Sequence, residues 1–339
     1  MFEANLPPRV TLAHTPTPFE GLPRLGEELG LALWAKRDDL TGAALSGNKV
    51  RKLEFLLADA LSQGATCVAT CGGVNSNHAR ATAVGARRLG MAPHLILRGN
   101  PPPVPVGNLF LDRWVGAEVE FISPEAWPRV DDLLAAWAER QRDAGEVPYV
   151  IPEGGSNGLG LLGYVHGCQE LLRDEARCDT RLGAVVHAVG SGGTTAGLAA
   201  GLALAGRDDV RVVGVAVCDD ARTFDAKIRR ILEEAAAAGY LPDAAVDRCR
   251  WEIVEGFVGP GYAKTDRSLL ESHRQAALTE GLVVDPVYTG KALDALVRRP
   301  DLGAEGDAAT VFLHTGGIFE LFAYAETAQG VLGSARSPF

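Results

Sequence analysis

Lys49 has the most unusual chemical setting of any residue in this sequence. It follows the polar segment 37–42 and opens a segment in which apolar residues recur at helical spacing. A cation in the first turn of a helix opposes the helix dipole, which favours anions there. Because Arg51 and Lys52 lie beside it, we expect the pKa of the Lys49 ammonium to be lowered. Lys49 is therefore a candidate amine nucleophile or Schiff-base former, although most lysines in such positions are simply solvated.

A glycine-rich loop at residues 190–195, GSGGTT, follows an apolar segment and opens another predicted helix. Backbone N–H groups and hydroxyls at a helix N-terminus can hold a phosphate group. The nearest alternative is the dinucleotide fingerprint G-x-G-x-x-G, which Gly190 and Gly192 begin and Thr195 breaks. Asp219 lies further along than the usual ~20 residues for the acidic partner of that fingerprint. We therefore predict a phosphate site in this loop.

Three further loops carry polar or aromatic side chains. The segment 72–78, GGVNSNH, lies between a predicted strand and helix and could hold a carboxylate, or Ser76 and Asn77 could simply cap the helix. The segments 285–291, DPVYTGK, and 314–317, HTGG, are predicted to be polar loops at strand ends, and Tyr262 follows a Pro-Gly pair. Each of these segments alone indicates no more than a turn.

The composition of the 339-residue chain is that of an ordinary globular protein, with 47% hydrophobic and 22% charged residues. The net charge of -10 argues against nucleic acid or an anionic membrane as the main partner. The N-terminus lacks the pattern of a signal peptide, and no apolar segment approaches the ~20 residues that span a bilayer. The six cysteines show no spacing typical of a metal site, so we expect reduced thiols, a cytoplasmic location and no metal.

Predicted strands and helices alternate along the chain. This alternation indicates βαβ units with mostly parallel sheets and helices on both faces, which is the α/β class. We expect two doubly wound open-sheet lobes, with ligands at the carboxyl ends of the strands. The predicted strands are 31–36, 66–70, 94–97, 118–122, 149–151, 184–189, 212–217, 251–254 and 310–313. The first predicted helix begins near Lys49, and the others span 78–89, 107–115, 128–144, 195–204, 221–238, 266–280 and 318–328.

Taken together, the segments resemble one known family. The sequences KRDDLTG, SGNKVRKLE, NSNHARAT, IPEGGSNGLGLLGY, GSGGTTAG, GYAK, DPVYTGKA and HTGG occur in the same order as in the pyridoxal-phosphate enzymes of fold type II. Within these enzymes the chain is similar to the D-cysteine desulfhydrase and 1-aminocyclopropane-1-carboxylate (ACC) deaminase group, from about Thr15 to Tyr324. The resemblance implies a homodimer with pyridoxal 5'-phosphate between two lobes. It also implies a large cofactor-binding domain, 1–51 with 168–339, and a small domain, 52–167.

The resemblance also implies a role for individual residues. Lys49 would hold the cofactor covalently and later move the substrate α-proton, while Tyr288 would stack against the pyridine ring and Tyr262 would line the substrate pocket. Catalytic roles are expected for Lys49, Ser76, Tyr262 and Tyr288. Cofactor contacts are expected for Lys49, Asn77, Ser191, Gly192, Gly193, Thr194, Thr195, Tyr288 and Thr315. Substrate contacts are expected for Ser76, Asn77, His78, Tyr262 and Thr289.

Two threonines distinguish the members of this group. ACC deaminases place a glutamate after the stacking tyrosine and a leucine before the late Gly-Gly, whereas this chain has Thr289 and Thr315, as the desulfhydrases do. A carboxylate keeps the pyridine nitrogen protonated and the ring a strong electron sink, but a threonine supplies no counter-charge. The weaker sink favours β-elimination of a good leaving group such as hydrosulfide. We therefore expect a lyase that converts D-cysteine to pyruvate, hydrogen sulfide and ammonia.

Four alternatives stay open. The first is an ACC deaminase, and the second is a lyase that releases another group, such as sulfite from cysteate. The third belongs to a different class, a nicotinamide-dependent oxidoreductase, and depends only on the loop at Gly190 and on Asp219. The fourth is a catalytically silent member of the family that binds the cofactor without turnover. The proline-rich segment 100–105 and residues 74–75 and 318–320 depart from the usual family pattern near the site, which leaves the leaving group and the hand of the α-carbon open.

Overall fold

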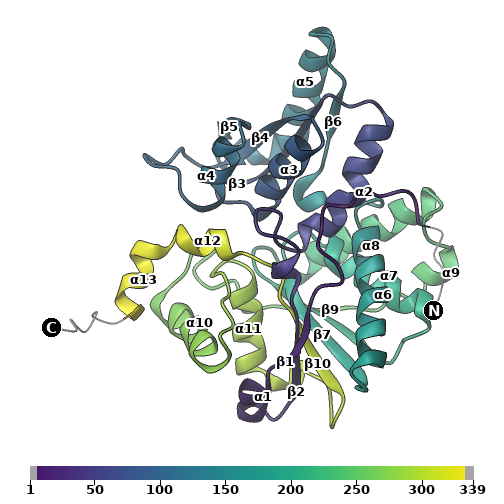
Figure 1. Ribbon diagram of the computed structural model, residues 1–339, viewed down its shortest axis with the longest axis vertical. Helices are drawn as coiled ribbons and strands as arrows, with labels where there is room; N and C mark the ends of the chain where they lie inside the picture. Colours follow the sequence, from purple (N-terminus) through teal and green to yellow (C-terminus); the bar gives the residue numbers. More distant parts are fainter. Residues whose placement is uncertain (1–5, 333–339) are drawn as a thin grey trace.

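The computed structural model describes residues 6–332, which form two open sheets with helices packed on them (Figure 1). The larger sheet has, in spatial order, strands β1 (Phe19–Gly21), β2 (Ala32–Lys36), β10 (Ala309–Leu313), β7 (Leu182–Val189), β8 (Arg211–Ala216) and β9 (Glu252–Val254). The smaller sheet has the order β5 (Glu118–Ile122), β4 (Ala92–Arg98), β3 (Cys67–Gly73) and β6 (Pro148–Val150). Every pairing is parallel except that of β1 with β2. The predicted α/β class with two open-sheet lobes is confirmed.

The helices follow the strands along the chain. They are α1 (Pro23–Leu29), α2 (Lys49–Ser62), α3 (Asn77–Arg88), α4 (Gly107–Trp114), α5 (Val130–Asp143), α6 (Leu162–Arg177), α7 (Gly193–Ala205), α8 (Ala221–Ala237), α9 (Asp243–Val246), α10 (Arg267–Glu280), α11 (Thr289–Arg298), α12 (Ile318–Phe322) and α13 (Ala325–Leu332). The 3-10 turns are η1 (Asp38–Leu40), η2 (Trp127–Arg129), η3 (Glu153–Gly155) and η4 (Pro300–Leu302). Within residues 6–332, no helix is both long and apolar enough to cross a membrane.

Apolar side chains project from both faces of the central strands, as expected for parallel strands that are covered by helices on each side. In β10, Val311 packs with α6 and α7, whereas the next residue, Phe312, packs with α1, α10 and α11. In the smaller sheet, Ile96 of β4 packs against α5, and Leu95 packs against α3. This alternation follows from the two-residue period of a strand. It buries each sheet between two helical layers and leaves the strand ends for polar loops.

The sequence analysis missed helices α1, α6, α9 and α11. In α6 and α11 the second residue is a glycine that resembles a loop residue. A Cβ on Gly163 of α6 would lie 2.5 Å from the backbone of Arg51, so this glycine allows α6 to pack closely on α2. A Cβ on Gly290 of α11 would lie 2.1 Å from the His273 ring of α10. The prediction that 285–291 is a loop at a strand end is therefore wrong, because α11 begins at Thr289 and no strand immediately precedes this segment in the described chain.

One predicted helix is divided in the structure, and the predicted domain boundaries fall inside helices. The segment 318–328 forms two short helices, α12 and α13, instead of one. All strands of the smaller sheet lie within 52–167, but the boundaries at 51/52 and 167/168 fall inside α2 and α6, which pack on each other. The division into domains at these residues stays a prediction.

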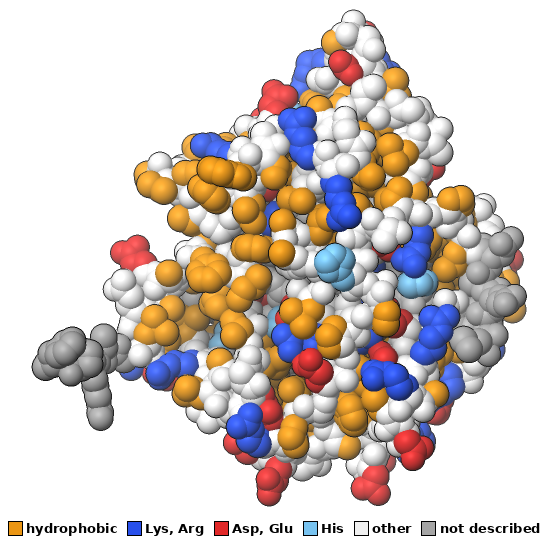
Figure 2. Space-filling model, in the orientation of Figure 1, with side chains coloured by type: hydrophobic (Ala, Val, Ile, Leu, Met, Phe, Trp, Pro, Cys, Tyr) orange, Lys and Arg blue, Asp and Glu red, His pale blue; other side chains and the backbone are white. Residues whose placement is uncertain are grey.

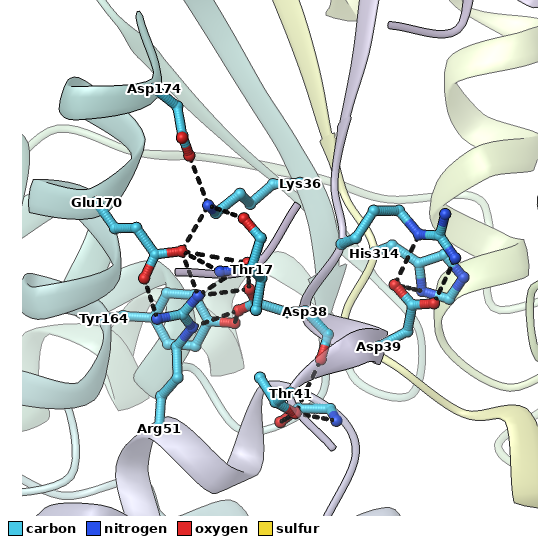
Figure 3. Close-up of polar contacts among 12 residues, drawn as sticks. Thr17, Lys36, Asp38, Asp39, Thr41, Arg51, Tyr164, Glu170, Asp174 and His314 are labelled. Atoms are coloured by element: carbon cyan, nitrogen blue, oxygen red, sulfur yellow. Dashed lines mark hydrogen bonds and ion pairs between the residues drawn. The ribbon is translucent and has the colours of Figure 1, made fainter. Parts of the chain in front are cut away.

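A buried ion network joins the start of α2 to strand β2 and helix α6 (Figure 3). Arg51 donates two hydrogen bonds to the Asp38 carboxylate, at 2.7 and 2.8 Å, and two to the Glu170 carboxylate, at 2.9 and 3.1 Å. Lys36 donates to Asp174 at 2.5 Å, and the Tyr164 hydroxyl donates to Asp38 at 2.5 Å. Although burial opposes ionisation of Glu170, the hydrogen bond and charge of Arg51 lower its pKa to about 2. The network therefore holds ionised groups in the interior by pairing them.

The first prediction concerns Arg51. Replacing Arg51 by Met leaves Asp38 and Glu170 buried without their main partner, so the free energy of unfolding should fall by about 3–5 kcal/mol. Urea unfolding followed by circular dichroism measures this loss. Arg229→Met is the matched control, because Arg229 makes an exposed helix pair with Asp225 and its removal should cost less than about 1 kcal/mol. Equal losses in the two variants would contradict a stabilising role for the network.

Candidate active site

A pocket between the two sheets collects side chains from loops that are far apart in the sequence. Lys49 enters it from the start of α2, and the loop between β3 and α3 enters from the smaller sheet. The loops after β7 and β10 enter from the larger sheet, at the carboxyl ends of its strands. Of the predicted site residues, the pocket is lined by Lys49, Ser76, Asn77, His78, Ser191, Gly192, Thr194, Thr195, Tyr262, Tyr288 and Thr315. Gly193 and Thr289 lie outside this lining.

The amine of Lys49 lies in the interior of the pocket. Its Nζ donates to Asn48 Oδ1 at 2.9 Å and lies 5.9 Å from the centre of the Tyr288 ring. Burial lowers the pKa of Lys49 to about 8, against the opposing charges of Asp285 and Glu320. The predicted lowering of the Lys49 pKa is confirmed. Its main cause is burial, whereas Arg51 and Lys52 are not among its main causes. A substantial fraction of this amine is therefore neutral and nucleophilic near pH 8.

The loop at 190–195 has the geometry of an anion cradle. Gly192 adopts a left-handed conformation (φ +86°), and α7 begins directly after it. The hydroxyls of Ser191 and Ser156 lie 2.8 Å apart, and Thr194 Oγ1 accepts from the Asn48 amide at 3.0 Å. Free N–H groups at a helix start, together with hydroxyls, provide donors for a phosphate. Gly193 contributes by close packing, since a Cβ there would lie 2.6 Å from Ser156 Oγ.

Lys52 is a residue of this cradle that the sequence analysis did not assign. Its Nζ donates to Ser156 Oγ at 3.0 Å and to the Gly154 carbonyl at 3.2 Å. A Cβ on Gly193 would lie 2.9 Å from this Nζ, which places the amine beside the loop. Burial lowers the pKa of Lys52 well below its ordinary value, so a bound phosphate would favour the charged form. The sequence contains one signal for Lys52: it lies three residues after Lys49 in the same helix, and residues three apart on a helix share a face.

The loop before α3 combines structural and chemical roles. Ser76 Oγ caps the helix by accepting from the Ala79 N–H at 3.2 Å, which is the structural alternative that the sequence left open. Asn77 Nδ2 donates to Glu320 at 2.8 Å. His78 Nε2 lies 2.8 Å from Thr70 Oγ1, while Nδ1 has no partner within the described residues. Burial lowers the pKa of His78 well below its ordinary value, so its ring is neutral at neutral pH.

Two tyrosines form one wall of the pocket. The Tyr262 and Tyr288 hydroxyls lie 2.7 Å apart, and their rings meet edge to face at 71°. A Cβ on Gly190 would lie 3.0 Å from the Tyr288 ring, so this glycine allows the ring to lie against the phosphate loop. Burial raises the pKa of both phenols, which keeps both hydroxyls protonated near neutral pH.

Thr289 acts on the pocket indirectly, through Asp285 and through the Gly316 carbonyl, which its hydroxyl contacts at 3.3 Å. The Thr289 hydroxyl donates to Asp285 Oδ1 at 2.5 Å, and Asp285 also accepts from the N–H groups of Val287, Tyr288 and Thr289. Asp285 lines the pocket, whereas Thr289 is 1% exposed and does not. Thr315 lines the pocket beside Asp285. The sequence analysis missed this carboxylate because Asp285 was considered only as part of a turn.

Other lining residues were also missed. His187, Ala188 and Val189 belong to β7, whose backbone leads into the phosphate loop, and no motif marks them. The other lining residues without an earlier assignment lie within the quoted sequence motifs; they are Asn48, Gly72, Glu153, Gly154 and Gly316. Burial is the largest influence on Glu153 and raises the pKa of its carboxyl. No group of three or more potential metal ligands occurs within residues 6–332.

The residues present fit pyridoxal phosphate. A buried lysine amine faces the pocket, a helix N-terminus with hydroxyls and Lys52 suits a phosphate, and the Tyr288 ring offers a flat face between them. The fit to a dinucleotide is poorer, because Asp219 makes an ion pair with Lys227 at 2.9 Å, outside the pocket lining. The arrangement can hold a phosphate at one end and present an amine near the other.

Comparisons with known proteins agree with this fit. Residues 10–316 match the family model described as "Pyridoxal-phosphate dependent enzyme". A putative 1-aminocyclopropane-1-carboxylate deaminase of Thermotoga maritima is 43% identical, over 93% of this chain and 98% of the relative. The mitochondrial bifunctional D-cysteine desulfhydrase/1-aminocyclopropane-1-carboxylate deaminase of Arabidopsis thaliana is 38% identical, over 96% of this chain and 82% of the relative.

A solved structure shows the same architecture. The crystal structure of an ACC deaminase homologue superposes with a TM-score of 0.83 at 36% sequence identity, and the match covers 97% of both chains. The family model covers most of the chain, and the relatives match nearly end to end. The protein belongs to the pyridoxal-phosphate-dependent enzymes, in the group of lyases that contains ACC deaminases and D-cysteine desulfhydrases, and its cofactor is pyridoxal phosphate.

Proposed function

We propose that the protein catalyses β-elimination from a small β-substituted amino acid, with D-cysteine as the leading substrate and pyruvate, hydrogen sulfide and ammonia as products. The observation that carries this proposal is the amine of Lys49, whose pKa is lowered to about 8 and which faces a pocket with donors for a phosphate and a carboxylate. The name of the Arabidopsis relative supports the substrate, since it includes D-cysteine desulfhydrase.

The residues of the pocket suggest a division of tasks. When bound, pyridoxal phosphate supplies an electron sink that stabilises negative charge at the substrate α-carbon. The neutral Lys49 amine accepts the α-proton, and the N-terminus of α3 beside Ser76 binds the substrate carboxylate. The Tyr262 and Tyr288 hydroxyls share one hydrogen bond, so one of their two protons is left to donate to the leaving group.

ACC deamination is the second candidate function. The buried Asp285 carboxylate lines the pocket, and a carboxylate is the feature that strengthens the electron sink for opening a cyclopropane. Thr289 and Thr315 replace residues typical of ACC deaminases, but Thr289 holds Asp285 in place. The two functions therefore differ in the role assigned to Asp285.

The proposal includes a cytoplasmic homodimer. Within residues 6–332 all six cysteines are free, which suits a reducing compartment. Hydrophobic side chains gather over α4 and over α10, α12 and α13 on one face of the molecule (Figure 2). The large exposed apolar residues there are Phe110, Trp114, Leu278, Phe322 and Leu332. Exposed apolar surface of this kind supports contact with a second copy of the chain.

A panel of substrates tests the proposed function. The purified protein with its cofactor should form pyruvate from D-cysteine or from β-chloroalanine, and both enantiomers of cysteine, serine and cysteate should be compared with ACC. ACC contains one more carbon, so its deamination yields 2-oxobutanoate, which chromatography separates from pyruvate. Formation of 2-oxobutanoate alone would favour the second candidate, and no oxoacid from any substrate would contradict both.

The Lys49→Ala variant tests the catalytic amine. Loss of the group that moves the α-proton should lower kcat by about 10²–10⁴-fold. Borohydride reduction of the wild-type protein, followed by peptide mass spectrometry, should place the cofactor on Lys49. Lys227→Ala serves as the control, because Lys227 pairs with Asp219 outside the pocket lining. Wild-type rates in the Lys49 variant would remove Lys49 from the mechanism.

The pKa of Lys49 predicts how cofactor attachment depends on pH. Burial favours the neutral amine, so the reactive form increases as the pH rises through about 8, instead of through the ordinary value of 10.5. The rate of cofactor attachment to the apoprotein, followed by absorbance, should therefore reach half of its maximum near pH 8. A midpoint above pH 10 would show that Lys49 has the pKa of a solvated lysine.

A further inference from the structure

A second cavity of about 570 Å³ adjoins the active-site pocket, and Tyr262 lines both. We call it the side chamber and define it by Gly73, Asn75, Arg98, Tyr262, Glu320 and Tyr324. Gly73 directly follows Gly72, which lines the active-site pocket, and it precedes the loop that begins α3. The side chamber therefore lies on the side of the pocket where the proposed substrate carboxylate binds.

Arg98 places a cation in the side chamber. It is the last residue of β4 and is paired in register with Gly73 at the end of β3. Its guanidinium carbon lies 4.6 Å from the centre of the Trp127 ring and 5.0 Å from that of Tyr262. Two aromatic faces thus hold the half-buried guanidinium in place by cation–π attraction. The same contact links its position to Tyr262, which also lines the active-site pocket.

The hydrogen-bonding capacity of Arg98 is unused. Among residues 6–332, no carboxylate lies within 4.0 Å of its guanidinium, and no acceptor makes a hydrogen bond with it. Aromatic rings contact the faces of a guanidinium, whereas its five N–H donors lie along the edge. This planar fork matches the oxygen atoms of sulfonate, phosphate or carboxylate groups. Arg98 therefore presents an unpaired binding group to the side chamber.

Glu320 does not cancel this charge. It is the acidic residue that lines the side chamber in the described chain, and it accepts a hydrogen bond from Asn77 Nδ2 at 2.8 Å. Burial, together with the nearby charge of Asp285, raises the pKa of Glu320 well above its ordinary value. The charged form of Glu320 is therefore disfavoured. Arg98 is the basic side chain on the lining of the side chamber, and Glu320 makes no ion pair with it within the described residues.

We propose that Arg98 forms a subsite for β-substituents that carry negatively charged oxygen atoms, such as the sulfonate of cysteate or the phosphate of O-phosphoserine. This inference rests on the proposed β-elimination, because it names the leaving groups that the same site accepts. A carboxylate at the Ser76 loop and an anionic group at Arg98 bind the two ends of a three-carbon amino acid. The β-carbon then lies beside Tyr262, which lines both cavities.

The reaction with these substrates balances without an oxidant or reductant. With cysteate, the α-C–H and Cβ–S bonds break, and sulfite leaves with the electron pair of the Cβ–S bond. One water molecule then enters by hydrolysis, and pyruvate and ammonia are released. With O-phosphoserine the Cβ–O bond breaks in the same way and phosphate leaves. Arg98 stabilises the negative charge that the leaving group carries throughout.

The test compares substrates with a charged and an uncharged β-substituent in the enzyme with bound cofactor. We expect Arg98→Met to lower the ratio of kcat/KM for cysteate or O-phosphoserine to kcat/KM for β-chloroalanine by about 10- to 100-fold, as expected for hydrogen bonds to a charged group. Arg98→Lys should lose less, because it keeps the charge but not the fork. Arg113→Met is the matched control, since Arg113 stacks on Phe121, is exposed and lies outside the lining of both cavities.

Two outcomes would overturn the subsite. One is an unchanged ratio in both Arg98 variants, and the other is wild-type protein that eliminates chloride from β-chloroalanine but neither converts nor binds cysteate or O-phosphoserine. If β-chloroalanine itself gives no pyruvate, the proposed elimination fails instead. The subsite is then judged by calorimetry on Lys49→Ala protein, in which the added Arg98→Met change must raise the dissociation constant of cysteate at least about tenfold.

Discussion

The site depends on three basic side chains in the first turn of α2, of which Arg51 and Lys52 are buried and Lys49 is half-buried. Lys49 enters the pocket, Arg51 enters the ion network with Asp38, and Lys52 reaches the phosphate loop. A buried cation is costly unless oxygen atoms or carboxylates compensate it, and each of the three has different partners. The glycine at position 163 then allows α6 to pack directly on this turn. The orientation of α2 is therefore set by charge pairing as well as by apolar packing.

Burial also sets the protonation states in the pocket. It favours the neutral form of Lys49 and keeps the hydroxyls of Tyr262 and Tyr288 protonated. Hydrogen bonds fix the Asp285 carboxylate in place, because three backbone N–H groups and the Thr289 hydroxyl donate to it. The pocket thus combines neutral proton donors and acceptors with one firmly held carboxylate. This combination suits chemistry in which protons move while the cofactor accepts electron density.

The two sheets contribute different parts of the site. The larger sheet supplies the loop at 190–195 and the segment after β10, which fit the cofactor. The smaller sheet supplies the loop at 76–78 and Arg98, which face the proposed substrate and the side chamber. Tyr262 is in contact with both parts, through the hydroxyl of Tyr288 and the guanidinium of Arg98. Tyr262 therefore links the part of the site that fits the cofactor to the part that lines the side chamber.

The sequence by itself determined the α/β class, the order of the polar loops and the choice of Lys49, because periodicity, glycine loops and motif order are local properties. It could not determine α6 and α11, since a glycine that allows close helix packing resembles a loop glycine until its neighbour is known. It also could not assign Lys52 to the phosphate cradle, Asp285 to the pocket or Arg98 to the side chamber. Their roles depend on side-chain direction and on partners distant in the sequence, which only the tertiary packing of the two sheets brings together.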